Sequence, residues 1–327
     1  MTSPVNVTPQ KYDYCMSLET TDKQSIGSRF WDWPFNVVCA IVLGWITQPW
    51  QVIRLRDLLV LLVSVGSVFA LLWWSDKYER EPVRTIVWAF LWGAFPACLF
   101  SYFVEGHLTT LSGGVLIEEG MKLLALYLII RRGSVQSWTD GLVMGGYLGL
   151  GFAANEDLFY AINSDSAFDM LVSRGIFSIF AHTFFSGLGA VVIVMGFLSR
   201  RWWLVLVGFL FAYFLHLTWN TVLAYEIFSE NVLGFFFFFS LIPPLILLLT
   251  AILVRRDERH KLLVQGKYAI DSGHMTEEQL WLVVNFKARR YAKRQLTSHH
   301  EKKALTAQIY DQTRLLLSKK YENREIA

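Results

Sequence analysis

The sequence has 327 residues, of which 54% are hydrophobic and 17% are charged, and its mean hydropathy is +0.38. This balance excludes an ordinary soluble globular domain and predicts an integral membrane protein with the lipid bilayer as its solvent. The formal charge of +3 is unevenly spread, because residues 255–327 contain 16 Lys/Arg against 9 Asp/Glu; no nucleic-acid partner is expected.

Apolar segments that are long enough to cross a bilayer, which takes about 20 residues, recur along the chain. A further apolar stretch, residues 33–50, is interrupted by Asn36 and Gln48, so it is either an eighth span or an interfacial helix. We therefore expect an all-α polytopic transmembrane helix bundle with 7-8 spans. The seven predicted spans are residues 57–74, 84–104, 113–130, 139–160, 174–198, 202–225 and 233–254.

Composition divides the chain into three parts. Residues 1–56 form an N-terminal tail with the uncertain first membrane segment, residues 57–254 the transmembrane core, and residues 255–327 a basic helical extension. Short loops rich in Lys and Arg favour the cytoplasmic side, and such pairs occur at 131–132 and 200–201. The C-terminal extension is therefore expected to be cytoplasmic, where its charge either solvates it or holds it near anionic headgroups.

Ionisable side chains inside the predicted spans are the strongest functional signal, because a charge at membrane depth is costly and usually faces a bundle interior or a water cavity. With about 1.5 Å of rise per residue, they fall in the outer leaflet although their helices run in alternating directions. Lys122 is expected to be structural or electrostatic, and Asp157 to be solvated or at a helix end. The residues assigned to the site are Glu118, Glu119, Glu156, His182, His216 and Asn220.

This residue set suits hydrolysis of a peptide bond, which needs a base for water, an acid for the leaving amine and donors for the oxyanion. Glu118 or Glu119 is expected to activate the water, and His182 to orient it and shuttle the proton. His216 and Asn220 are expected to stabilise the oxyanion. The preferred mechanism requires no cofactor, but Glu and His are also ligands of zinc and other divalent metals, so a metal-assisted mechanism stays open.

The order of these motifs resembles the PrsW family of intramembrane proteases, which is similar to the CAAX-prenyl protease and Abi group. The resemblance implies that Glu118 and Glu119 are paired essential glutamates, and that Glu156, His182 and His216 are the other buried polar residues of the site. The matching segments are DKYEREP (76–82), EEGMK (118–122), DGLVMGGYLGLGFAANED (140–157), AHTFFSGLG (181–189) and HLTWN (216–220).

The resemblance also implies a function. Family members are similar to site-1 proteases that cut membrane-anchored anti-sigma factors on the extracytoplasmic side. We therefore expect an intramembrane endopeptidase of the bacterial cytoplasmic membrane, whose substrates are single-span membrane proteins cut near that side. Two alternatives are a catalytically silent scaffold or receptor that signals through the basic tail, and a transporter that uses the buried carboxylates. No sequence pattern specifies the oligomeric state or the scissile bond.

Overall fold

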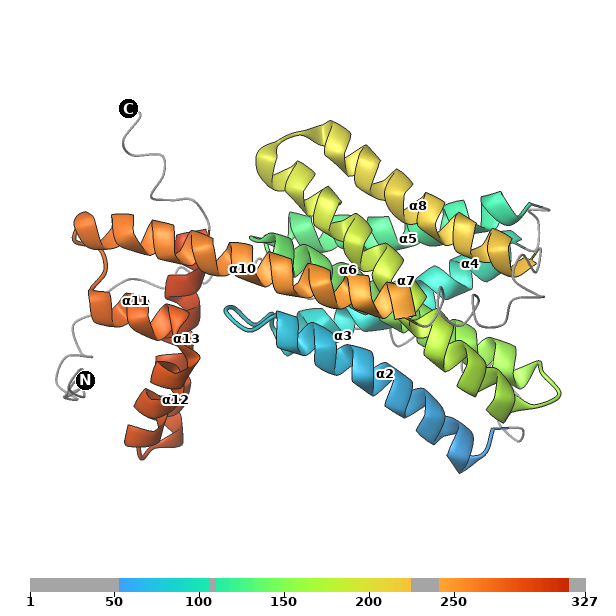
Figure 1. Cartoon of the computed structure of the whole chain (residues 1–327), viewed down its shortest axis with the longest axis horizontal. Coiled ribbons are helices and arrows are strands. Elements are labelled where there is room, and N and C mark those ends of the chain that lie inside the picture. The colour runs from blue at the N-terminus through green and yellow to red at the C-terminus, as the bar shows by residue number, and fades with distance from the viewer. Residues whose placement is uncertain (1–52, 106–109, 225–240, 318–327) are drawn as a thin grey trace.

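The computed structural model describes residues 53–105, 110–224 and 241–317, and within these ranges all the regular elements are helices (Figure 1). The all-α prediction is thus confirmed for the described part of the chain. Residues 33–50 and the first part of the predicted span 233–254 lie outside it. The membrane-type helices are α2 (Leu55–Ser75), α3 (Val83–Trp92), η5 (Gly93–Ala97), α4 (Cys98–Glu105), α5 (Leu111–Arg131), α6 (Trp138–Ile162), α7 (Ala167–Ser199), α8 (Trp202–Ala224) and α10 (Ile242–Asp271).

Among the described residues, four helical stretches are long and apolar enough to cross a membrane: Leu55–Ser75, Val83–Val104, Ala167–Ser199 and Trp202–Val222. Their outer faces are apolar, with the side chain of Leu62 65% exposed and that of Phe214 56% exposed. An apolar surface of this extent suits contact with lipid rather than water. The helices α5 and α6 have 21 and 25 residues and carry several of the buried charges, so the total of seven or eight spans stays a prediction.

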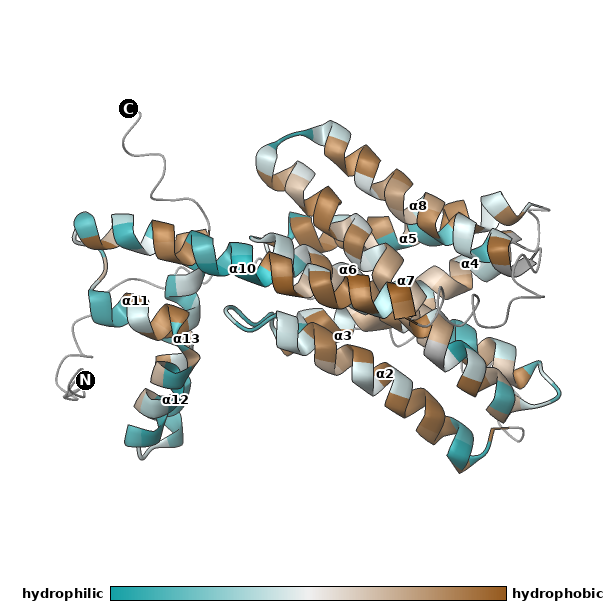
Figure 2. Cartoon of the chain, in the orientation of Figure 1, coloured by the Kyte–Doolittle hydropathy of each residue, from teal (hydrophilic) through white to brown (hydrophobic). Residues whose placement is uncertain are grey.

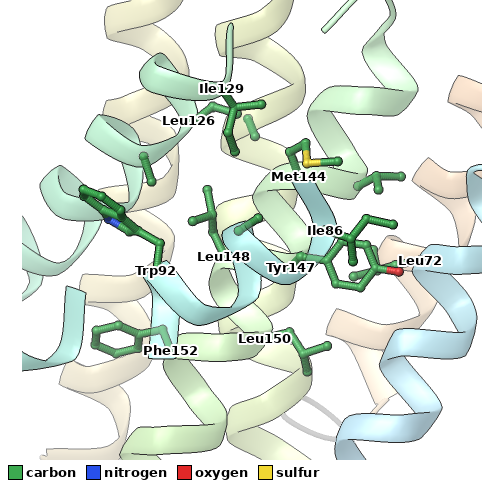
Figure 3. Packing of buried hydrophobic residues seen from close by; sticks show 14 of the residues in the cluster. Leu72, Ile86, Trp92, Leu126, Ile129, Met144, Tyr147, Leu148, Leu150 and Phe152 are labelled. Carbon is green, nitrogen blue, oxygen red and sulfur yellow. The ribbon is translucent and has the colours of Figure 1, made fainter. Parts of the chain in front are cut away.

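The helix α6 lies at the centre of the bundle, and every residue from 139 to 154 is buried. A Cβ atom added at Gly145 would lie 2.3 Å from the Cβ atom of Ala190, and one added at Gly151 would lie 2.0 Å from the carbonyl oxygen of Phe90. The α6 backbone therefore approaches α7 on one side and α3 on the other more closely than any side chain would permit. Figure 3 shows apolar side chains such as Tyr147 that fill the remaining space.

The second predicted span is not a uniform α-helix. Pro96 lies inside it and has no backbone N–H to donate, and residues Gly93–Ala97 form a π-helical turn between α3 and α4. This turn packs against α6. The irregularity thus lies beside the helix that carries Glu156.

The predicted boundary at residue 255 falls inside one helix, because α10 continues without interruption from Ile242 to Asp271. Figure 2 shows that α10 is hydrophobic in its first half and largely hydrophilic in its second. The second half packs with α11 (Glu277–Val284) and α13 (His299–Leu317). These helices and α12 (Phe286–Gln295) enclose a small core of their own, which agrees with the predicted helical C-terminal extension.

Two arginines dock the C-terminal helices on loop 76–82, which joins α2 to α3. Arg289 of α12 donates a hydrogen bond to the carbonyl oxygen of Tyr78 at 3.1 Å. Arg314 of α13 pairs with Glu79, whose carboxyl group is buried. The basic extension is therefore packed against the membrane core rather than attached only through α10.

Candidate active site

The first group of site residues lies on α5. Thr110 caps the helix by accepting a hydrogen bond from the backbone N–H of Gly113 at 3.3 Å, which places Glu118 and Glu119 about two turns inside. Both glutamates and Lys122 are buried. Adjacent residues on a helix point about 100° apart, so the two carboxyl groups have different neighbours.

Glu119 connects α5 to α8. Its Oε1 atom accepts a hydrogen bond from Lys122 Nζ at 2.8 Å and lies 2.9 Å from Nδ1 of His216. The Lys122 ammonium also lies 4.0 Å from the ring centre of Phe152. Glu119 and Lys122 therefore form a buried ion pair within α5. Because an ionised carboxylate only accepts hydrogen bonds, the geometry assigns the His216 proton to Nδ1 and leaves Nε2 as the free nitrogen.

His182 of α7 lies between two charged partners. Its Nε2 atom is 3.1 Å from Oε2 of Glu156, and its Nδ1 atom is 3.4 Å from Nζ of Lys122. The ring centres of His182 and His216 are 4.7 Å apart, and the two rings are nearly perpendicular. The α5, α6, α7 and α8 helices therefore bring Glu119, Glu156, His182 and His216 into one connected group.

Glu118 faces the same centre from the other side. Its Oε2 atom lies 3.6 Å from Nε2 of His216, which is longer than a hydrogen bond. One potential ligand atom each from Glu118, His182 and His216 lies within 4.8 Å of the other two. Two imidazoles and one carboxylate are a donor set that catalytic zinc sites use, with a position left for water. These residues therefore fit a divalent metal ion.

The charges around this centre are unequal. Apart from the two histidines, four carboxyl groups, on α5 and α6, meet two cationic side chains, Lys122 and Arg174. When all the carboxyl groups are ionised, negative charges exceed positive ones by two. A divalent cation would balance this excess, whereas the nearness of Lys122 to His182 opposes a cation at Nδ1.

The end of α6 holds an arginine that the sequence did not assign to the site. Arg174 of α7 donates hydrogen bonds from Nη2 to Oε2 of Glu156 at 2.6 Å and from Nε to Oδ1 of Asp157 at 2.7 Å. Its guanidinium group also lies 4.0 Å from the ring centre of Tyr160. The expectation that Asp157 is solvated or ends a helix is wrong, because its side chain is fully buried and Arg174 neutralises it.

Asn220 is the assigned site residue with the weakest structural support. It lies one turn after His216 on α8 and is half-buried, as the four-residue spacing predicts. The structure shows no hydrogen bond from its amide to another residue within the described ranges. Its role in oxyanion stabilisation therefore stays a prediction.

A cavity adjoins the site between α5, α6, α7 and α8. Its volume is about 20 Å³, room for about one water molecule, and Glu119, Lys122 and Ser186 supply its polar wall. The Oγ atom of Ser186 is buried and has no hydrogen-bond partner among the described residues. Leu148 and Phe209 are among the apolar residues that form the rest of the lining. The cavity offers room for water next to the polar group.

Comparison with known proteins gives an independent view of this region. Residues 81–248 match the family model described as PrsW family intramembrane metalloprotease, and this range includes every assigned site residue. The chain is 31% identical over 147 residues to a protein named Protease PrsW of Clostridioides difficile (strain 630), an alignment that covers 39% of this chain and 61% of that protein. It is 24% identical over 179 residues to a protein of the same name from Geobacillus kaustophilus (strain HTA426), covering 47% and 76%. No solved structure is significantly similar to the chain.

Proposed function

The chain belongs to the PrsW family of intramembrane metalloproteases, and from this premise we propose that it is itself an intramembrane endopeptidase. The observation that carries the proposal is the convergence of buried Glu119, Glu156, His182 and His216 from four helices, through contacts of 2.8 to 3.4 Å that include those of Lys122. Ionisable groups at membrane depth are costly and usually mark a functional site. Peptide hydrolysis would use each of these groups, either in the reaction or in orienting a reacting group.

We propose that Glu118 acts on the attacking water. Its carboxylate lies 3.6 Å from the Nε2 atom of His216, so one water molecule beside the pair can contact both atoms. Glu119 holds His216 by its Nδ1–H, and Glu156 holds His182 by its Nε2–H. Each histidine therefore presents its other nitrogen in a fixed orientation.

Glu118, His182 and His216 would hold a divalent cation such as zinc. The ion would lower the pKa of bound water and polarise the scissile carbonyl group. The protein's own part is to orient the two imidazoles through Glu119 and Glu156 and to exclude bulk water by burial, while Glu118, as a ligand, lies beside the bound water and can take its proton. The family description as a metalloprotease supports this version.

A metal-free glutamate mechanism is the second candidate, and Lys122 favours it. The Lys122 ammonium lies 3.4 Å from Nδ1 of His182, so it already supplies a positive charge where a metal ion would lie. In this version His182 passes the proton to the leaving amine, and His216 and Asn220 stabilise the oxyanion. Treatment of the purified protein with a chelator, followed by zinc readdition, separates the two versions. Activity that survives full metal removal excludes the metal-assisted one.

The substrates that we propose are single-span membrane proteins, cut near the extracytoplasmic side; an anti-sigma factor is the substrate that the family resemblance suggests. This direction rests on the positive loops at 131–132 and 200–201, which favour the cytoplasmic side and so place the opposite ends of the neighbouring helices outside. Variants with a single cysteine, Asp165→Cys or Trp203→Cys, test the topology by labelling with a membrane-impermeant maleimide in intact cells. We expect labelling at 165, on the outside, and none at 203. Labelling at 203 rather than 165 would contradict it.

The activity test is cleavage of a single-span reporter in cells and in detergent. We expect the wild-type protein to cleave it and the variants Glu118→Gln, Glu119→Gln, His182→Ala and His216→Ala to lose most or all of this activity. The matched controls Glu278→Gln and His260→Ala change exposed residues of the same types and should leave cleavage intact. Cleavage that survives all four site substitutions would refute the assignment.

A further inference from the structure

Each histidine of the site is the last of three side chains in contact: a cation contacts a carboxylate, and the carboxylate contacts the imidazole. We call each such series a chain of contacts. In the first chain, Lys122 pairs with Glu119 at 2.8 Å, and Glu119 contacts Nδ1 of His216 at 2.9 Å. In the second, Arg174 pairs with Glu156 at 2.6 Å, and the same Oε2 atom of Glu156 contacts Nε2 of His182 at 3.1 Å. The two chains repeat one arrangement around the two imidazoles.

We propose that Arg174 is a positioning residue of the hydrolytic site, which holds Glu156 so that Glu156 fixes the ring and tautomer of His182. The proposal rests on the proposed protease function for its kinetic consequences. A carboxylate that accepts the N–H of a working histidine needs a second anchor, because it otherwise rotates about its terminal torsion. Arg174 supplies that anchor from α7, two helical turns before His182 itself.

The guanidinium group is well suited to this task because its planar fork contacts three acceptors at once. Nη2 contacts Glu156 at 2.6 Å and the Ser178 hydroxyl at 3.3 Å, while Nε contacts Asp157 at 2.7 Å. The ring of Tyr160 supports its face. These contacts fix the plane of the guanidinium group, and a lysine would supply the charge without the planar fork.

Arg174 could instead serve only to fasten α6 to α7, and Asp157 separates the two roles. Asp157 makes the fastening contact with Nε but has no contact with His182 in the structure, whereas Glu156 joins Arg174 to His182. Weakening the contact between Arg174 and Asp157 should therefore lower the stability of the protein more than kcat. Loss of the contact between Arg174 and Glu156 should lower kcat.

The kinetic test uses the single-span reporter with Arg174→Lys, Arg174→Gln, Glu156→Gln and the Arg174→Gln/Glu156→Gln double variant. We expect kcat to fall by about 10- to 100-fold in Arg174→Gln, the usual cost of losing a partner that orients a site histidine, with KM nearly unchanged. Arg174→Lys should recover part of this loss. The double variant should be no slower than the slower single variant, because both changes break one pathway.

The contrast variant is Asp157→Asn, whose amide oxygen still accepts the Nε–H of Arg174 but lacks the charge. It should lower the thermal midpoint and change kcat by less than about threefold. If Arg174→Gln proves too unstable to assay, Arg174→Lys carries the same comparison with Asp157→Asn. Multiplicative losses in the double variant, or an equal loss of kcat in Asp157→Asn, would overturn the positioning role in favour of helix fastening.

A measurement without substrate keeps this proposal separate from the proposed function. In protein labelled with ¹⁵N at histidine, His182 should show the proton on Nε2 in the wild type and a mixture of tautomers in Arg174→Gln, with the signal assigned by His182→Gln. An unchanged His182 signal in Arg174→Gln overturns the positioning role. If the wild type cleaves no reporter but this shift occurs, the proposed function fails while the positioning contact stands.

Discussion

Glu119 and His216 are 97 residues apart in the chain, yet Oε1 of one lies 2.9 Å from Nδ1 of the other. The same oxygen accepts the hydrogen bond of Lys122. Glu119 therefore orients a histidine, while the neighbouring Glu118 faces the free Nε2 atom of that histidine. The paired glutamates, which look equivalent in the sequence, have different places in the site.

This difference predicts different kinetics for the two isosteric substitutions. Glu118→Gln removes the group that takes the proton of water and should lower kcat by about 100-fold or more. Glu119→Gln keeps an amide oxygen that can accept the Nδ1–H of His216, so the expected loss is about 10- to 100-fold. Reporter cleavage at saturating substrate measures both values, with Glu278→Gln as the control. A larger loss in Glu119→Gln than in Glu118→Gln would reverse the assignment.

The sequence predicted most of the site because charged residues are rare in apolar spans and each one was visible. It missed Arg174 because the predicted span began at that residue, where an arginine at the membrane boundary needs no partner. In the structure α7 begins at Ala167, so Arg174 lies two turns inside the helix and pairs with Glu156 and Asp157. The predicted start of this helix was two turns too late. For that reason Arg174 was overlooked in the sequence, and Asp157 was expected to be solvated. Two adjacent acids near the end of α6 were the signal that a cation was required.

The helix positions in the bundle were predictable from hydropathy, but two details were not. Hydropathy is averaged over a window, so it did not show that Pro96 interrupts the second span with a π-helical turn. It also ended the last span at residue 254, where polar residues begin, although the helix continues through Gly266 and ends only at Asp271, before Ser272 and Gly273. The length of a helix depends on its backbone hydrogen bonds, whereas hydropathy indicates only whether a segment lies in lipid or in water.

Lys122 should be essential to the stability of the site whatever its part in the chemistry. Lys122→Met removes the ammonium 2.8 Å from Glu119 and leaves a buried carboxylate without its cation, which costs about 3 to 5 kcal/mol. Adding Glu119→Gln removes the stranded charge and should recover much of that loss. Equilibrium unfolding in mixed detergents compares the wild type, the single variant and the double variant. Equal stability of Lys122→Met and the wild type would contradict the ion pair.

The contact between α6 and α7 should tolerate no side chain at Gly145. A Cβ atom there would lie 2.3 Å from Cβ of Ala190 and 2.5 Å from the carbonyl oxygen of Ser186. Gly145→Ala must separate the two helices and should destabilise the protein by about 1 to 3 kcal/mol. Gly120→Ala is the matched control, because no atom lies within 4 Å of its added Cβ and alanine favours a helix by roughly 0.8 to 1 kcal/mol. Thermal unfolding should give opposite signs for the two variants.

The docking of the C-terminal helices should depend on pH through Glu79 in loop 76–82. Burial, helped by the nearby Asp140 and Asp311 and opposed by Arg314, raises the pKa of the Glu79 carboxyl group from 4.5 to about 7. Because the folded protein holds this proton more tightly than the unfolded chain, the stabilisation is complete below pH 4.5 and is lost as the pH rises through 7. Glu81, whose pKa burial raises to about 10, changes stability in the same direction.

The variant Glu79→Gln isolates the contribution of Glu79, because Glu81 stays in both proteins. Between pH 6 and pH 8 the wild type should lose about 1 kcal/mol more stability than Glu79→Gln, as a pKa near 7 in the folded state implies. Arg314→Gln should make stability fall more steeply with rising pH below pH 8, because it removes the cation that holds the pKa of Glu79 down. Thermal unfolding of the detergent-solubilised protein at the two pH values provides the measurement. Parallel pH profiles for the wild type and Glu79→Gln would show that Glu79 is already ionised throughout this range, and the buried contact with Arg314 would then be a permanent ion pair.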